Sequence, residues 1–266
     1  PNDVFRAYIA RQVGLGAKYM ISQHGGVYGV SLIPPKAEYV EHRVSDKWLS
    51  WGWGCSNNKK VSIGFNVKSN LKDAPNPNWK GFLLLAIPAV EFSPTRIVYS
   101  DPMEIINQHN ILLSNIDSKI KKEVLIRPAP AHVNYKYWKS IAKNYKFSDG
   151  GGFYDDLRKS RLFLCTSNST TLLEALYFNF PTIVFFPHTE AYIRAEAMPY
   201  FNELKCAGIL FTDIKMVAGK ISEVWDNIEG WWYKGSVQKA RKSFCKQYSN
   251  KSNLPIQEIS KHIKSL

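Results

Sequence analysis

Apolar and polar positions follow each other along the chain in blocks that predict an α/β fold. Short apolar stretches are typical of buried strands, and the segments between them carry apolar residues at helical spacing. Strands are predicted at residues 17–22, 81–89, 124–127, 162–165 and 182–186. Helices are predicted at residues 3–13, 101–115, 135–144, 153–157, 169–178 and 191–204, and in the tail from 215 to 266. This alternation predicts a parallel sheet with helices on both faces.

Two regions interrupt the pattern. Residues 34–60 are rich in aromatic side chains and show no clear period, so we expect irregular structure there. Residues 69–80 are polar and contain two prolines, which indicates a linker and the boundary between two domains. The sequence begins with Pro1-Asn2-Asp3 and enters a helical pattern at once, so we expect a fragment whose N-terminal part lies outside this chain.

The composition is that of a globular protein. Hydrophobic residues make up 45% of the 266 positions and charged residues 21%, which excludes a disordered chain. No apolar run is long enough to span a bilayer as a helix. The four cysteines have no metal-ligand spacing, so we expect no metal site.

The chain is strongly basic. Its formal net charge is +13 and its pI is near 9.5, which favours an anionic partner such as a nucleotide, an acidic glycan or a phospholipid surface. No nucleic-acid-binding motif is present, so we expect no nucleic-acid partner. The tail combines Trp231 and Trp232 with several lysines, which suits either an anionic bilayer surface or a solvated helix packed on the body.

A cluster of small polar residues separates the strand at 162–165 from the helix that follows. The first N–H groups of a helix lack intrahelical partners and face the positive end of its dipole, so such a cluster favours a phosphate, although simple N-capping would also use one of its members. Glu174, one turn further along, would then accept hydrogen bonds from ribose hydroxyls. The cluster consists of Ser167, Asn168, Ser169, Thr170 and Thr171.

A glycine-rich loop follows the first predicted strand. Gly25 and Gly26 would let the backbone approach a ligand closely, and His24 would donate to a phosphate or a sugar hydroxyl. A tight turn is the alternative interpretation of these glycines. Gln23 and Tyr28 flank them and are further candidates.

Carboxylates in the aromatic-rich region are candidates for catalysis. Group transfer to or from a sugar needs a carboxylate as base or nucleophile, and aromatic faces stack on sugar rings. Asp46 and Glu41, with Glu38 nearby, precede Trp48, Trp51 and Trp53. Solvated loop charges beside core tryptophans explain the same residues equally well.

Two further segments carry polar residues after strands. Arg127 ends one strand and would pair with a phosphate or a carboxylate, unless it is an ordinary surface arginine. His188, Glu190 and Arg194 follow the strand that ends at 186, where a glutamate at a helix start also suits the helix dipole.

Together these segments resemble a bacterial family of surface-carbohydrate (O-antigen) biosynthesis transferases. The similar segments are QHGGVYG at 23–29, SDKWLSWGWG at 45–54, LIRPAP at 125–130, RLFLCTSNSTTLLEAL at 161–176 and EAYIRAEAMPYFNELKCAGILF at 190–211. The resemblance implies a GT-B glycosyltransferase with Rossmann-like domains and no metal or cofactor besides its nucleotide-sugar donor. It also extends to the retaining β-Kdo transferases, which use CMP-activated ulosonic acids.

The resemblance assigns roles to the candidate residues. Asp46 would be the catalytic carboxylate and Glu41 its helper. The nucleotide-sugar would be held by His24, Gly25, Gly26, Arg127, Ser167, Asn168, Ser169, Thr170, Thr171 and Glu174, with Gln23, Tyr28, Glu190 and Arg194 as possible additions.

The expected protein transfers a sugar, such as Kdo from a CMP-linked donor, to a glycan or lipid-linked glycan during O-antigen, capsule or lipopolysaccharide synthesis. It would act in the cytoplasm, at the inner face of the membrane. Residues 1–72 would end an acceptor-side domain, 73–230 would bind the donor, and 231–266 would form a basic tail. The alternatives are a UDP- or GDP-sugar transferase, a polyol-phosphate transferase or an epimerase on the same scaffold, and a non-catalytic nucleotide- or membrane-binding protein.

Overall fold

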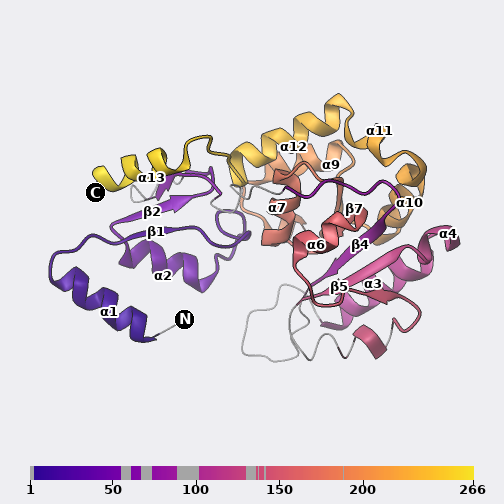
Figure 1. The fold of residues 1–266 in the computed structure, drawn as a ribbon, viewed down its shortest axis with the longest axis horizontal. Coiled ribbons are helices and arrows are strands. Elements are labelled where there is room, and N and C mark those ends of the chain that lie inside the picture. The colour runs from indigo at the N-terminus through magenta and orange to yellow at the C-terminus, as the bar shows by residue number, and fades with distance from the viewer. Residues whose placement is uncertain are drawn as a thin grey trace.

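Two parallel sheets organise the chain (Figure 1). The computed structural model describes residues 3–54, 61–66, 74–88, 102–129, 136, 138–140, 142–187 and 189–266. The small sheet has the strand order β1-β2-β3, and the large sheet has the order β6-β5-β4-β7-β8-β9. All pairings within both sheets are parallel, so the predicted α/β class is confirmed.

The elements have the following bounds. The small sheet contains β1 (Met20–Ser22), β2 (Lys47–Ser50) and β3 (Val61–Ile63). The large sheet contains β4 (Phe82–Ile87), β5 (Val124–Pro128), β6 (Lys146–Phe147), β7 (Ser160–Cys165), β8 (Thr182–Phe185) and β9 (Leu210–Phe211). The helices are α1 (Asp3–Gly14), α2 (Lys36–Val44), α3 (Pro102–Asn115), α4 (Ser118–Lys121), α6 (Phe153–Arg158), α7 (Thr170–Tyr177), α8 (Thr189–Tyr192), α9 (Met198–Cys206), α10 (Ile214–Val224), α11 (Ile228–Trp232), α12 (Gly235–Tyr248) and α13 (Pro255–Lys264), with a 3-10 turn at Trp225–Asn227.

The core lies in the centre of the large sheet. Successive residues Leu83, Leu84 and Leu85 of β4 are all buried, so both faces of this strand are covered. Leu84 pairs with Leu125 of β5 on one side and Phe163 of β7 on the other. Helices α3 and α10 pack against each other, and α12 packs on α7 and α9. Continuous apolar strands of this kind are typical of parallel sheets sandwiched between helices.

Two expectations about secondary structure are wrong. Residues 34–60 contain α2 and β2, because Trp48 and Trp51 are core residues of the small sheet rather than loop aromatics. The helix expected at 191–204 is divided into α8 and α9, because residues 192–194 bond to residues 30–32 instead of to their own helix. The helix predicted at 135–144 lies partly outside the described residues. Pro130 and His188 also lie outside them.

The C-terminal segment packs on both sheets. Helix α12 belongs to the large sheet, whereas α13 lies over the small one, where Lys47 Nζ donates to the His262 carbonyl oxygen at 2.9 Å (Figure 1). Between them, Asn250 donates its N–H to the Trp51 carbonyl oxygen and accepts from the Asn66 N–H.

The predicted domain limits at 72 and 230 stay a prediction. None of the described helices is long and apolar enough to cross a membrane.

Gly52, just after β2, lies against the backbone of α12. Its φ is +126°, and a Cβ there would lie 2.5 Å from the Lys246 carbonyl oxygen. We expect Gly52→Ala to lower the free energy of unfolding by about 2–4 kcal/mol in urea titrations, because both the backbone angle and the contact are unfavourable. Gly219→Ala is the control. Gly219 lies in α10 with open space at its Cβ position, so alanine should stabilise by about 0.5–1 kcal/mol. Equal unfolding midpoints for the two variants would contradict this packing.

Candidate functional site

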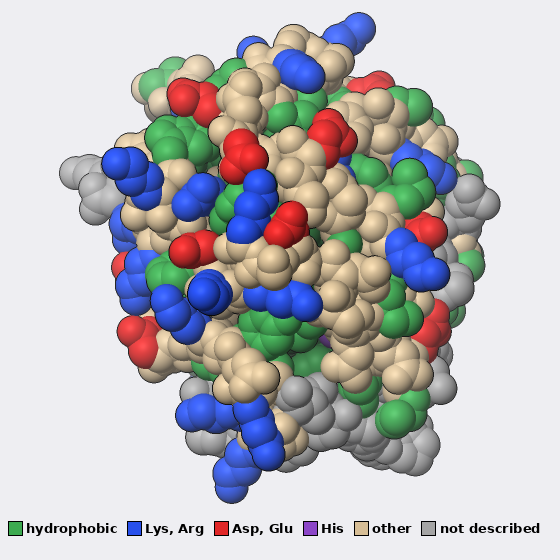
Figure 2. Space-filling model, turned by 90° about the vertical axis from the view of Figure 1, so that its right-hand side faces the viewer, with side chains coloured by type: hydrophobic (Ala, Val, Ile, Leu, Met, Phe, Trp, Pro, Cys, Tyr) green, Lys and Arg blue, Asp and Glu red, His purple; other side chains and the backbone are tan. Residues whose placement is uncertain are grey.

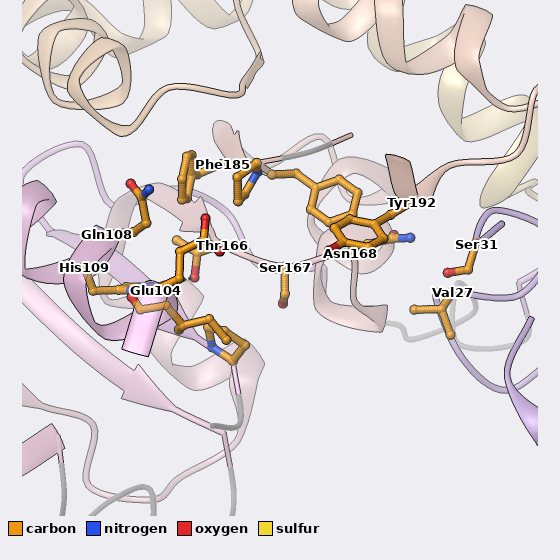
Figure 3. A pocket seen from close by; sticks show the side chains of 14 residues that line it. Val27, Ser31, Glu104, Gln108, His109, Thr166, Ser167, Asn168, Phe185 and Tyr192 are labelled. Atoms are coloured by element: carbon orange, nitrogen blue, oxygen red, sulfur yellow. Dashed lines mark hydrogen bonds between the residues drawn. The ribbon is translucent and has the colours of Figure 1, made fainter. Parts of the chain in front are cut away.

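A cavity of about 210 Å³ opens at the carboxyl ends of β4, β7 and β8 (Figure 3). Ligands of open α/β sheets bind at this edge. About half of its wall is apolar or aromatic, and most of its polar groups come from α3 and from the residues that follow β7. The lining residues are Val27, Ser31, Pro88, Glu104, Ile105, Gln108, His109, Thr166, Ser167, Asn168, Phe185, Phe186, Pro187 and Tyr192.

Asn168 is the most unusual residue of this wall. Its amide nitrogen and oxygen are both buried, and neither has a hydrogen-bond partner among the described residues. An unsatisfied buried polar group costs about 1–3 kcal/mol, which a ligand with a matching acceptor and donor would recover. Asn168 and Ser167 were both expected at the site, and the structure places both on the cavity.

The glycine-rich loop after β1 meets the start of α7. The Gly26 N–H donates to Thr170 Oγ1 at 3.1 Å, and a Cβ at Gly26 would lie 2.5 Å from the Ser169 carbonyl oxygen. Two segments that the sequence analysis singled out independently are therefore in contact. Gly25 belongs to the same turn, where its carbonyl oxygen accepts from Gln23 Nε2.

His24 in this loop pairs with Glu41 of α2. Its Nε2 lies 2.8 Å from Glu41 Oε1 and 2.9 Å from the Tyr28 hydroxyl, while Trp48 Nε1 donates to the other Glu41 oxygen at 3.2 Å. Burial, followed by the Glu41 carboxylate, raises the pKa of Tyr28 well above its usual value, so the phenol keeps its proton. The His24 side chain is 61% exposed. A carboxylate that orients an accessible imidazole is an arrangement suited to general base catalysis.

The family follows from the sequence match. Residues 2–263 match the LIC12162 family transferase. The chain belongs to this transferase family. No curated protein matches it.

Solved structures agree on the fold of the transferase. HepE from Anabaena, in complex with UDP and glucose, superposes with a TM-score of 0.53 at 13% identity, over 98% of this chain and 73% of that one. The wall teichoic acid polymerase TagF, soaked with CDPG for 15 minutes, has a TM-score of 0.50 at 12% identity, over 93% of this chain and 66% of that one. The present chain spans 60% of the length of the TagF chain in another solved structure. These matches confirm the predicted GT-B fold, and the prediction of a transferase family is confirmed as well.

The rest of the hydroxyl cluster does not line the cavity of the transferase. Ser169 Oγ lies 2.8 Å from Thr171 Oγ1, and Thr170 Oγ1 accepts from Gly26. The close approach of Gly26 covers this end of α7. Of the five residues expected to hold a phosphate, Ser167 and Asn168 line the cavity and the other three do not.

Glu174 is also displaced from its expected role. It is buried within α7, and the Tyr154 hydroxyl is its hydrogen-bond partner. Burial first, and the Glu174 carboxylate second, raise the pKa of Tyr154. The carboxylate on the cavity is Glu104 of α3, which the sequence analysis missed together with Gln108. Their spacing of four residues on a helix after a buried strand was the available signal.

Asp46 lies outside the site. Its N–H donates to the Tyr19 carbonyl oxygen, its Oδ2 accepts from the Tyr19 N–H, and Lys18 Nζ is 3.3 Å from its Oδ1. These contacts put Asp46 at the amino ends of β1 and β2, whereas His24 follows the carboxyl end of β1. This position does not support Asp46 as the catalytic carboxylate, which stays a prediction from the sequence.

Gln23, Arg127 and Arg194 have structural partners. Gln23 is buried, and its Oε1 accepts from the Trp51 N–H and Trp53 Nε1. Arg127 forms a buried ion pair with Asp156 instead of lining the cavity. Arg194 pairs with a carboxylate of α2, and Glu190 lies in α8. Among the described residues, no group of three or more His, Cys, Asp or Glu is placed to hold a metal ion.

His109 forms the floor of the cavity. Its Nδ1 lies 2.7 Å from the Ile105 carbonyl oxygen, and its Nε2 lies 2.9 Å from Thr166 Oγ1, which is also 2.8 Å from the Ala86 carbonyl oxygen. Burial lowers the pKa of His109 to about 4, against a partial upward effect of the bond to Ile105. The ring is therefore neutral at pH 7.

This burial predicts a pH dependence of stability. Unfolded His109 takes up a proton near pH 6.5 and folded His109 near pH 4, so protons favour the unfolded chain between these values. We expect up to about 3 kcal/mol of stability, present above pH 6.5, to be lost as the pH falls to 4. His109→Gln should remove this part of the loss, as measured by urea unfolding at pH 7.5, 6 and 4.5. Parallel stability curves for the wild type and the variant would contradict it.

Proposed function

We propose that the chain is the donor-binding part of a glycosyltransferase that moves a sugar from a nucleotide to a glycan. The observation that carries the proposal is the contact between Gly26 and Thr170, which brings the His24–Glu41 pair beside the cavity. Membership in a transferase family supports group transfer as the reaction class.

The cavity suits a nucleoside better than a phosphate. Among the described residues that line it none is Lys or Arg, and Glu104 would repel an anion. Phe186 and Tyr192 are aromatic residues of the wall that stay partly exposed, and they would stack on a flat base. The Asn168 amide matches the donor and acceptor pair at the edge of a base. Glu104 and Gln108 of α3 are the candidates to accept from ribose hydroxyls, and Ser167 to donate to the adjoining phosphate.

The His24–Glu41 pair would activate the acceptor. With the Nε2 proton held by Glu41, His24 Nδ1 is left to take the proton of an acceptor hydroxyl as that oxygen attacks the donor. The bond from the transferred group to the nucleotide phosphate breaks, and the nucleotide leaves with the electron pair. Glu41 stabilises the imidazolium that forms, so Glu41 supports the base and replaces Asp46 in the proposed catalytic set.

A CMP-linked ulosonic acid such as Kdo is the donor that the resemblance favours, with a surface glycan or lipid-linked glycan as acceptor. The net charge of +13 would suit a reaction at an anionic membrane face. A polyol-phosphate transfer is the second candidate, because the fold is similar to that of TagF, whose crystals were soaked with CDPG. An imidazole base would serve attack at phosphorus as well as at carbon.

The donor is tested by binding. CMP, CDP, UDP, GDP and ADP are compared by calorimetry and thermal shift, and one of them should raise the melting temperature. Asn168→Leu should weaken that nucleotide at least 10-fold and yet stabilise the free protein by about 1 kcal/mol, because an unsatisfied buried amide is removed. Asn115→Leu, on the exposed part of α3, is the control and should leave the affinity unchanged. An Asn168→Leu variant with wild-type affinity would refute the nucleoside cavity.

The catalytic roles are tested by turnover with the nucleotide-sugar found in this way. His24→Gln should lower kcat about 10²–10⁴-fold with little change in nucleotide affinity, because general base catalysis contributes that much. Glu41→Gln should also lower kcat. Asp46→Asn should stay within a few-fold of the wild type. Loss of turnover in Asp46→Asn alone would restore the hypothesis drawn from the sequence.

A further inference from the structure

A two-residue pairing forms one wall of the cavity. Ser31 and Ile193 form an antiparallel bridge, the Arg194 N–H donates to the Val30 carbonyl oxygen at 2.9 Å, and the Leu32 N–H donates to the Tyr192 carbonyl oxygen at 2.8 Å. Ser31 and Tyr192 both line the cavity. The position of this wall therefore depends on how residues 30–32 and 192–194 are held together.

The Arg194 side chain strengthens the pairing. Its Nε donates to the Ser31 carbonyl oxygen at 2.7 Å, and its Nη2 lies 2.6 Å from Glu38 Oε1. The second Glu38 oxygen accepts from the Gly29 N–H at 3.1 Å. Gly29 has a φ of +71° and lies against the indole of Trp53, so a larger residue does not fit at this point of the loop.

Helix α2 holds the loop at two points. Glu38 and Glu41 are three residues apart and project from neighbouring positions of the helix. Glu38 binds Gly29 near the end of the loop, and Glu41 binds His24 at its beginning. Arg194 joins this helix and loop to the segment that carries Tyr192.

We infer that Arg194 is a positioning residue whose ion pair with Glu38 holds the loop from His24 to Ser31 in a fixed place against the nucleotide cavity. The inference rests on the proposed function and adds the link between donor binding and the base. Fixed hydrogen bonds would here set the distance between the donor and His24, and would keep the His24 proton on Nε2. Stability alone does not require such a pair, because buried ion pairs contribute little net stability compared with apolar packing.

The chain contains a matched control. Arg127 and Asp156 form a second partly buried ion pair, and both arginine side chains are 23% exposed. The carboxylates are 5% exposed for Glu38 and 1% for Asp156. Neither Arg127 nor Asp156 lines the cavity. Removing either arginine leaves a buried carboxylate, so the destabilisation should be similar.

The experiment compares Arg194→Met with Arg127→Met. Both variants should melt at lower temperature. Only Arg194→Met should weaken the nucleotide at least 10-fold by calorimetry, and only Arg194→Met should change the ring ¹⁵N spectrum of His24 from the Nε2-protonated tautomer to a mixture. Glu38→Gln, which keeps the volume and one acceptor, is measured as a second variant and should show the same two changes to a smaller extent.

The inference is overturned if Arg194→Met keeps the wild-type nucleotide affinity and the wild-type His24 spectrum. If Arg194→Met does not fold, the same result in Glu38→Gln overturns it. It is also overturned if Arg127→Met changes the affinity and the spectrum as much as Arg194→Met does. If the wild type binds none of the nucleotides, the proposed function fails. The ¹⁵N spectrum needs no nucleotide, so it still decides whether Arg194 positions His24.

Discussion

The close contact of Gly26 with the first residues of α7 is the constraint on which the rest of the site depends. A side chain at position 26 would overlap the Ser169 backbone, and the Gly26 N–H is bonded to Thr170. Because the loop begins at the end of β1 and α7 follows β7, this contact joins the carboxyl edges of the two sheets. Val27 of the same loop lines the cavity, so this contact helps to hold the loop that carries His24 against the cavity wall.

The two sheets contribute different chemistry to this junction. The large sheet supplies a mainly apolar cavity, and Asn168 on its wall has an amide with no hydrogen-bond partner among the described residues. The small sheet supplies an exposed imidazole oriented by a carboxylate, which in turn is held by Trp48. Donor binding favours a mainly apolar pocket, whereas proton transfer needs an accessible imidazole. One site can have both properties when different elements supply them.

The sequence predicts the segments of the site better than the roles of their residues. Apolar periodicity identifies most strands of the large sheet, and clusters of glycine and hydroxyl residues identify both segments that meet at Gly26. Glu174 is hydrogen-bonded to Tyr154, and Arg127 forms an ion pair with Asp156. Both partners lie far away along the chain, so no local sequence pattern reveals them.

Asp46 shows how one missed element misplaces a residue. If β2 is not recognised, Asp46 belongs to an aromatic-rich loop, and the sequence does not show on which side of the sheet it lies. Once β2 is placed at Lys47–Ser50, Asp46 precedes the strand, and in a parallel sheet that position is the amino edge, away from the ligand. Aromatic core residues without a regular period concealed this strand.

The positive charge of the chain acts on a longer range than the cavity does. Figure 2 shows Lys and Arg spread over the face around the large sheet, with Asp and Glu among them. Some cations of the described residues are paired, as in Lys119 with Asp226 and Lys220 with Glu223. The cavity wall itself has no Lys or Arg among its described residues. Charges of this kind raise the rate at which an anionic donor or membrane is met, and salt screens them over about 8 Å. Under the proposed function, selection among donors is left to the cavity, where shape and the Asn168 amide would decide. A rise in ionic strength should therefore slow the association of the donor without changing the preference among donors.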